Sequence, residues 1–286
     1  MKRTVIFAAA LLLSIAASAA SRIEKCSMNS KILGVTKEYV VYVPDGYDEN
    51  PGKAYPVLYL LHGLGGDCRT WTEKYDMKVI ADWRIESGFC LPMLIVMPDA
   101  RGVLPNNKGR NVGYVNRDGW MYEDYFFNEL IPEIESAFRV LPGAKNRALS
   151  GLSMGGAGTV IYAMHHPESF SSACPMSARV EGTPGIEPGT GGDSEEFYAY
   201  SRKHNMVEYF KSQNAEKVAE IGKVRWYFDC ADGDGLLEGE THLYFLMRKA
   251  GIKSVNLRVR EGAHKADYWR TSLPEVMTYC SIGFAE

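Results

Sequence analysis

The sequence predicts an α/β protein in which a mostly parallel central sheet is covered by helices on both faces, and three observations predict it. Segments typical of strands alternate with helical segments along most of the chain. Two of the strand segments are short, continuous apolar runs, as in strands buried on both faces of a parallel sheet. A chain of 286 residues, 46% of them hydrophobic, can bury a sizeable core.

The individual elements follow from hydrophobic periodicity and turn residues. The first strand, residues 36–43, alternates, is rich in Val and Tyr, and ends at Pro44 and Gly46. The other expected strands are 55–61, 93–97, 148–150, 171–176, 224–230 and 255–260. The expected helices are 76–86, 120–138, 154–165, 238–250 and 268–284, and Pro132 should kink or restart the second of them.

The chain shows no internal repeat and no long linker, so residues 21–286 are expected to form one domain. Residues 179–219 interrupt the alternation with several Pro and Gly residues and then turn polar and helical. An insertion of this length predicts a lid or binding loop, and a surface excursion without a role is the alternative.

The N-terminus has the features of a secretory signal peptide. Lys2 and Arg3 precede an apolar stretch over 4–17, which leads into small residues up to Ala20. The apolar run is shorter than the roughly 20 residues that span a bilayer. Glu24 and Lys25 precede Cys26, which does not fit a lipid-modified cysteine. We therefore expect residues 1–20 to be removed and the mature protein to be secreted or periplasmic, without a membrane anchor.

Charge and cysteine content exclude several functions. The formal net charge is −3 and no basic run could follow a phosphate backbone, so nucleic acid is not an expected partner. Six cysteines are too sparse for a disulfide framework, and we expect at most one or two bridges, of unspecified pairing. They form no CxxC pair, and the spacing around Asp232 and Asp234 does not fit a calcium loop. We expect neither a metal nor a cofactor.

The strongest functional signal is the segment Gly151-Leu152-Ser153-Met154-Gly155, between an expected strand and an expected helix. In a nucleophile elbow the serine occupies a strained turn from strand to helix, and the flanking glycines let the backbones pack closely. A chance match in a glycine-rich chain is the alternative, but the strand-turn-helix context favours a nucleophilic Ser153.

A nucleophilic serine needs a base and an orienting carboxylate. His264 follows the strand 255–260, and Asp232 and Asp234 both follow the strand 224–230. The order Ser, Asp, His is typical of α/β-hydrolases, and the strand-end positions bring the three residues to one rim of the sheet. The residues alone leave Asp232 and Asp234 both open as the acid.

Acyl transfer also requires hydrogen-bond donors for the developing oxyanion. One expected donor is the backbone N–H of Met154, directly after the nucleophile. The other is the N–H of Leu64, in the loop His62-Gly63-Leu64-Gly65-Gly66 that follows the strand 55–61. His62 is expected to pack or hydrogen-bond beneath this loop.

With these motifs in view, the chain resembles the esterase D-like α/β-hydrolases, and within them the feruloyl and acetylxylan esterases of carbohydrate esterase family 1. The resemblance runs from about Lys37 to Phe284. The family commonly has Cys-Gly-x-x-Asp where this chain has residues 230–234, which implies Asp234 as the triad acid. It commonly has Gly-Gly-His where this chain has residues 262–264. Both departures replace Gly by Ala, which leaves the triad intact and the subfamily open.

The resemblance implies a serine esterase that removes feruloyl or acetyl groups from a plant cell-wall polysaccharide such as xylan. Export would suit a polymeric substrate. Aromatic residues that could stack on a feruloyl ring or a sugar are Tyr114, Trp120 and Trp269, together with Phe197, Tyr198 and Tyr200. The alternatives are another acyl hydrolase or acyltransferase on this fold, acting on lipid esters or peptides, and an inactive carbohydrate-binding homologue.

Overall fold

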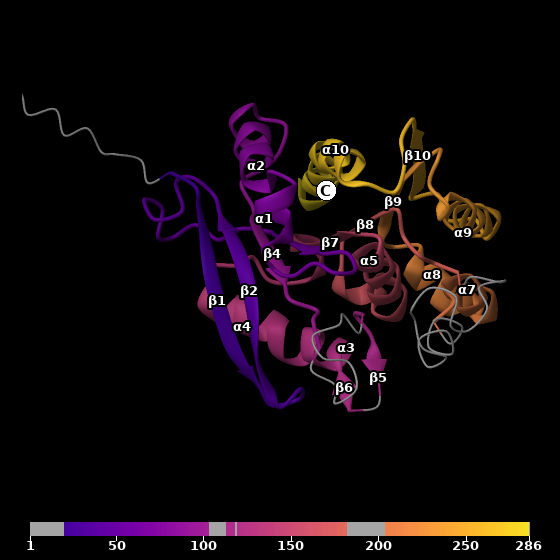
Figure 1. The fold of residues 1–286 in the computed structure, drawn as a ribbon, viewed down its shortest axis with the longest axis horizontal. Helices are drawn as coiled ribbons and strands as arrows, with labels where there is room; N and C mark the ends of the chain where they lie inside the picture. The colour runs from indigo at the N-terminus through magenta and orange to yellow at the C-terminus, as the bar shows by residue number, and fades with distance from the viewer. Residues whose placement is uncertain (1–19, 103–112, 118, 182–203, 286) are drawn as a thin grey trace, which may run out of the picture.

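The computed structural model describes residues 20–102, 113–117, 119–181 and 204–285. Within these residues eight strands form one sheet, in the order β1-β2-β4-β3-β7-β8-β9-β10 (Figure 1). The six strands from β4 to β10 are parallel, whereas β1 and β2 pair antiparallel at one edge. The strand bounds are β1 Arg22–Ser30, β2 Val35–Val43, β3 Val57–Leu61, β4 Leu94–Pro98, β7 Arg147–Leu152, β8 Ser172–Met176, β9 Arg225–Ala231 and β10 Val255–Arg260.

Helices cover both faces of the sheet, as predicted. Alternate residues of β3 show the two layers, because Val57 and Tyr59 join one hydrophobic cluster while Leu58 and Leu60 join the other. The second cluster lies under α1 (Thr70–Lys74), α2 (Met77–Glu86) and α10 (Ala266–Ala285). The first cluster lies under α3 (Tyr122–Tyr125), α4 (Ile131–Ala137), α5 (Met154–His165), α7 (Met206–Ser212), α8 (Ala215–Ile221) and α9 (Leu237–Lys249). Figure 1 shows α2 and α10 together on one side and α5 on the other.

The strand order creates a switch point between β3 and β7. The chain leaves β3 toward β4 on one side, and it leaves β7 toward β8 on the other. Ligand sites of parallel α/β sheets lie outside the carboxyl ends of the strands at such a point. Leu61 and Gly151 are paired there, and Ser153 lies two residues after Gly151, just past the end of β7.

Three elements differ from the sequence-based expectation. The short helix α1 was not predicted. The strand β1 was not predicted, because its polar residues alternate only weakly with apolar ones, and its pairing with β2 creates it. The expected helix 120–138 is divided: the ribbon β5 (Asn116–Arg117) and β6 (Trp120–Met121) leads into α3, a π-helical turn at Phe126–Leu130, and α4. Pro132 lies in the first turn of α4, where its missing N–H removes no hydrogen bond within that helix.

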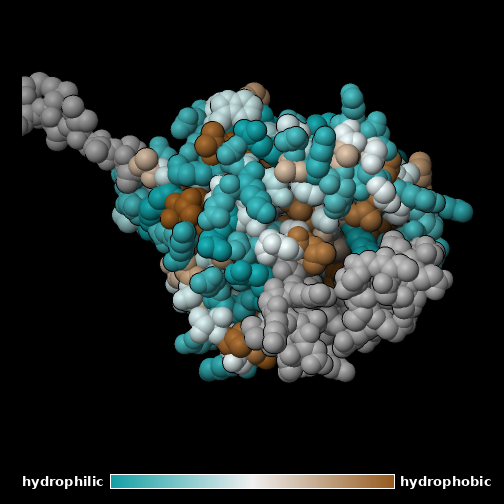
Figure 2. Space-filling view, in the orientation of Figure 1, coloured by the Kyte–Doolittle hydropathy of each residue, from teal (hydrophilic) through white to brown (hydrophobic). Residues whose placement is uncertain are grey.

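Parts of two predictions lie outside the described residues. These are most of the expected signal peptide and residues 182–203 of the expected lid, whose described remainder contains α7 and α8. Among the described helices, none combines the length and the apolar character needed to cross a membrane. Hydrophilic side chains dominate the face in Figure 2, and hydrophobic ones occur there in small, separate groups. All six cysteines are free thiols, with the sulfur atoms of Cys174 and Cys280 3.5 Å apart.

Candidate active site

Ser153 occupies a sharp turn between β7 and α5. Its φ of 55° lies in the left-handed region that side-chain-bearing residues rarely adopt. Only glycine fits on either side of it. A Cβ at Gly151 would lie 2.5 Å from the carbonyl oxygen of Gly155, and a Cβ at Gly155 would lie 2.5 Å from that of Leu61. The glycines therefore allow the close backbone contact that holds Ser153 in this strained conformation.

Ser153, His264 and Asp234 form a hydrogen-bonded relay along the rim of the sheet. His264 Nε2 lies 2.9 Å from Ser153 Oγ, and His264 Nδ1 lies 2.8 Å from Asp234 Oδ2. The His264 side chain is partly exposed, with 37% of its surface accessible, whereas the Asp234 side chain is only 1% accessible. The arrangement can remove a proton from the serine hydroxyl and hold the resulting imidazolium beside a buried carboxylate.

The surroundings of Asp234 keep it ionised. Burial acts to raise the pKa of this carboxyl, but the hydrogen bonds from His264, from the Leu236 N–H and from Ser177 outweigh burial, so the pKa lies below its ordinary value. The Leu236 N–H donates to Asp234 Oδ1 at 2.9 Å. Asp232 has a different environment: its Oδ1 accepts the Gly262 N–H at 3.0 Å, which fixes the loop that leads to His264. Of the two carboxylates left open by the residues, Asp234 contacts the histidine.

The loop after β3 packs against the nucleophile turn. A Cβ at Gly63 would lie 2.5 Å from Leu152 Cδ1 and 3.6 Å from Ser153 Cβ. The backbone at Gly63, directly before Leu64, is therefore adjacent to Ser153, while the Leu64 side chain is 64% exposed. Met154, the other expected oxyanion donor, begins α5. These two amides thus lie in the segments that directly follow β3 and β7, the two strands that flank the switch point.

Three of the six aromatic residues proposed for substrate stacking are described, and they have different positions. Phe197, Tyr198 and Tyr200 lie outside the described residues. Tyr114 and Trp120 are each only 2% exposed, so neither offers a ring face to a substrate. Both belong to the core that supports α5 and α3. Trp269 is 7% exposed and lies edge-to-face against His264, with ring centroids 4.8 Å apart. Its position indicates contact with the histidine, which the residue type alone did not suggest.

The sequence analysis did not identify Ser177 as part of this site. Ser177 follows β8, is fully buried and has a φ of 46°. Its Oγ accepts the Trp269 indole N–H at 3.0 Å, and its own N–H donates to the Asp229 carbonyl oxygen at 2.9 Å. The one available signal was its place at a strand end on the same rim as Ser153.

A pocket of about 600 Å³ adjoins the acid side of the relay. It is lined by Asp234, Gly235 and the α9 side chains Leu237, Glu238, Thr241, His242 and Phe245. In the described part of the chain, no group of three or more His, Cys, Asp or Glu side chains is arranged to hold a metal ion.

Comparison with known proteins places this geometry in a family. The model of a family named Esterase matches residues 30–279. An endo-1,4-beta-xylanase/feruloyl esterase from Xylanibacter ruminicola is 32% identical over 257 residues, which cover 89% of this chain and 30% of the relative. Esterase Rv1288 from Mycobacterium tuberculosis is 38% identical over 135 residues, covering 46% of this chain and 27% of the relative. The chain thus spans less than a third of the length of these curated relatives.

Solved structures agree with the family match. A ferulic acid esterase, 32% identical, superposes with a TM-score of 0.83 over 92% of this chain and 99% of its own. A ferulic acid esterase from Anaeromyces mucronatus, solved with ferulic acid, is 22% identical and shares the fold at a TM-score of 0.69, over 93% of this chain and 92% of its own. With its switch-point serine and mostly parallel eight-stranded sheet, the chain belongs to the Esterase family, within the esterase D-like α/β-hydrolases of carbohydrate esterase family 1.

Proposed function

We propose that this protein is an exported serine esterase that removes feruloyl or acetyl groups from a plant cell-wall polysaccharide such as xylan. The observation that carries the proposal is the relay of Ser153, His264 and Asp234 at the switch point. The ferulic acid esterase that resembles the chain over nearly its full length supports the feruloyl group as the first candidate. Export rests on the N-terminal sequence, and it brings the enzyme to a polymer outside the cytoplasm.

In the first step, Ser153 Oγ attacks the ester carbonyl carbon while His264 Nε2 takes the hydroxyl proton. The carbonyl oxygen becomes an oxyanion, which the N–H groups of Leu64 and Met154 stabilise. When the tetrahedral intermediate collapses, the bond to the sugar oxygen breaks. His264 returns its proton to that oxygen, and the acyl group stays on Ser153.

In the second step, His264 takes a proton from water, and the resulting hydroxide attacks the acyl carbon. The bond to Ser153 Oγ then breaks, the free acid leaves, and the proton on His264 returns to the serine oxygen. Asp234 does not change its protonation state in either step. It accepts the hydrogen bond from Nδ1–H of His264 throughout and thereby keeps Nε2 available as the base.

The test compares methyl ferulate and acetylated xylan as substrates of the purified protein, with Ser153→Ala as the blank. We expect Ser153→Ala to fold and to lose on the order of 10³-fold or more in kcat. Ferulate release would indicate a feruloyl esterase, and acetate release alone an acetylxylan esterase. Near-normal turnover by Ser153→Ala would refute the mechanism. Failure of the wild type to label with a fluorophosphonate would favour an inactive carbohydrate-binding homologue.

Two isosteric substitutions test the acid. Asp234→Asn removes the charge that holds the Nδ1 proton of His264, and about 10⁴-fold in kcat is lost in the analogous change of a serine protease triad. Asp232→Asn keeps a carbonyl oxygen that can accept the Gly262 N–H, and we expect it to stay within about 10-fold of wild type. The reverse order of effects would assign the acid to Asp232.

A further inference from the structure

The peptide group that joins Gly63 to Leu64 is held from its carbonyl side. The Gly63 carbonyl oxygen accepts two hydrogen bonds, from His62 Nδ1 at 2.8 Å and from the Gly66 N–H at 3.1 Å. All peptide bonds described are trans, and in a trans peptide the C=O and N–H bonds point in opposite directions. The Leu64 N–H therefore points away from His62, and it donates to no residue that the structure describes.

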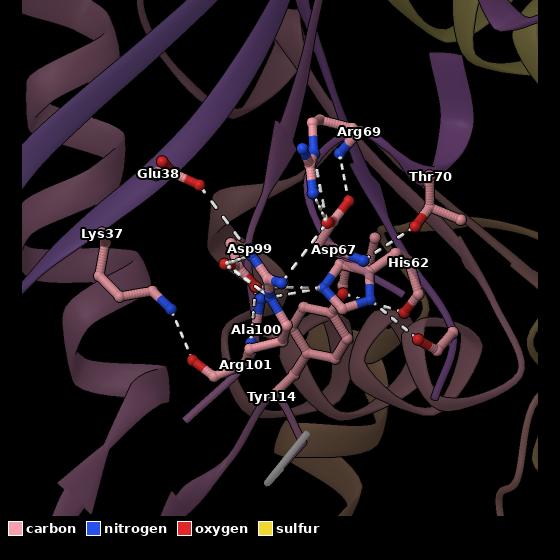
Figure 3. Close-up of polar contacts among 12 residues, drawn as sticks. Lys37, Glu38, His62, Asp67, Arg69, Thr70, Asp99, Ala100, Arg101 and Tyr114 are labelled. Atoms are coloured by element: carbon pink, nitrogen blue, oxygen red, sulfur yellow. Dashed lines mark hydrogen bonds and ion pairs between the residues drawn. The ribbon is translucent and has the colours of Figure 1, made fainter. Parts of the chain in front are cut away.

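His62 is itself fixed by a backbone donor on a different strand connection. The N–H of Ala100, which follows β4, donates to His62 Nε2 at 2.9 Å (Figure 3). Because a backbone N–H can only donate, Nε2 must be unprotonated, and the proton of the neutral ring must be on Nδ1. The ring is 1% exposed, and Tyr114 Oη donates to the backbone carbonyl oxygen of His62 at 3.0 Å. Both ring nitrogens are thus used, and the ring has one tautomer and one orientation.

We infer that His62 is a positioning residue for the oxyanion hole, which acts through the Gly63 carbonyl to aim and polarise the Leu64 N–H. The inference rests on the proposed function, because it assigns a role to a donor of that reaction. A hydrogen bond that a peptide carbonyl accepts makes the N–H of the same peptide group a better donor, so donation from His62 Nδ1 to the Gly63 carbonyl strengthens the Leu64 N–H, while the Ala100 N–H fixes the ring that donates. His62 never touches the substrate in this arrangement.

Two substitutions separate the two hydrogen bonds of the ring. In His62→Asn, the side-chain amide nitrogen would occupy the region of Nδ1 and could still donate to the Gly63 carbonyl. The longer side chain of His62→Gln would reach the region of Nε2, where its oxygen could accept from Ala100, but it would leave the Gly63 carbonyl without its side-chain donor. The variants are matched in chemistry and differ in which bond they keep.

The assay uses 4-nitrophenyl acetate, so that it does not depend on the natural acyl group. Removal of an entire oxyanion donor costs about 10²- to 10³-fold in kcat, and a donor that loses only its orientation should cost less. We expect His62→Gln to lose about 10- to 100-fold in kcat with KM within about 3-fold, and His62→Asn to retain kcat within about 3-fold. The inhibition constant of a phenylboronic acid, which forms a tetrahedral adduct on serine, should weaken in parallel with kcat.

Several outcomes would overturn the inference. Full kcat in His62→Gln, or an equal loss in both variants at equal thermal stability, would mean that His62 only packs beneath the loop. If His62→Gln does not fold, the nitrogen-15 shifts of the wild-type imidazole decide, because a proton found on Nε2 would contradict the tautomer required here. Ser153→Ala is measured in the same series. Loss of turnover in that variant with full kcat in His62→Gln refutes only this inference, whereas turnover without Ser153 refutes the proposed function as well.

Discussion

Folding stability should depend on pH through His62. The pKa of this histidine is lowered from 6.5 to about 4, and burial of the ring is the largest cause. The carbonyl of Gly63 and the carboxylates of Asp99 and Asp67 act in the opposite direction, while Lys37 lowers the pKa further. Asp99 Oδ1 lies 3.9 Å from His62 Nε2. Nε2 already accepts the hydrogen bond from the Ala100 N–H, so protonation of Nε2 would break that bond and place two N–H donors against each other.

The sign and size of the effect follow from proton linkage. The folded protein binds the His62 proton more weakly than the unfolded chain does, so stability rises with pH. The contribution of neutral His62 is complete above about pH 6.5 and is lost as the pH falls toward about 4. The difference between the two pKa values corresponds to about 3 kcal/mol at low pH, of which about 2 kcal/mol is already lost at about pH 5.

The measurement is denaturant unfolding of wild type and His62→Gln at several pH values from about 7.5 to about 5. Glutamine does not titrate, so the difference in unfolding free energy between the two proteins should shrink by about 2 kcal/mol over this range. We compare two proteins because Glu240 is present in both, and its raised pKa makes the free energy of unfolding fall as the pH rises, opposite to the effect of His62. If the two stability curves run parallel, the assignment of a buried, neutral His62 is refuted.

Two further predictions concern stability at other positions. Gly155→Ala would bring its Cβ to 2.5 Å from the Leu61 carbonyl oxygen, and we expect it to lower the free energy of unfolding by about 3 kcal/mol or more. In the control Gly52→Ala the new Cβ meets nothing within 4 Å, so the free energy of unfolding should stay within about 0.5 kcal/mol of wild type. Equal unfolding midpoints of the two variants in urea would contradict the packing argument. Burial raises the pKa of Glu240 well above its ordinary value, so its ionisation opposes folding. Glu240→Gln should therefore stabilise the protein increasingly as the pH rises above about 5. The same pH profile of thermal unfolding in wild type and Glu240→Gln would refute this.

The elements that the sequence predicted best carry their own local signals. The helix predicted at 154–165 and the strand predicted at 255–260 match α5 and β10. Gly151, Ser153 and Gly155 define the start of α5 through the space that they leave, and this information is local. The strand β1 could not be predicted in this way, because its residues form a strand only through their register with β2, such as Cys26 opposite Tyr39.

At the site, strand ends could be predicted and side-chain direction could not. Ser153 and His264 each follow a strand, and the parallel sheet brings them together. Asp232 and Asp234 are two residues apart in one turn, so only the path of the backbone decides which one meets His264. For the same reason Trp269 was expected to face the substrate, while its indole N–H is in fact bonded to the buried Ser177.

Two chains of hydrogen bonds converge on Ser153 from different strands. One runs from Asp234 through His264 to the Ser153 hydroxyl and increases the basicity of His264 Nε2. The other runs from Ala100 through His62 to the Gly63 carbonyl and orients the Leu64 N–H, the donor proposed for the oxyanion. Each chain begins at a strand end, on a backbone N–H or on a buried carboxylate, so the sheet anchors one end of it. This explains why a strained serine and a buried neutral histidine can persist together at the rim: the strands that impose both costs also share the hydrophobic core that offsets them.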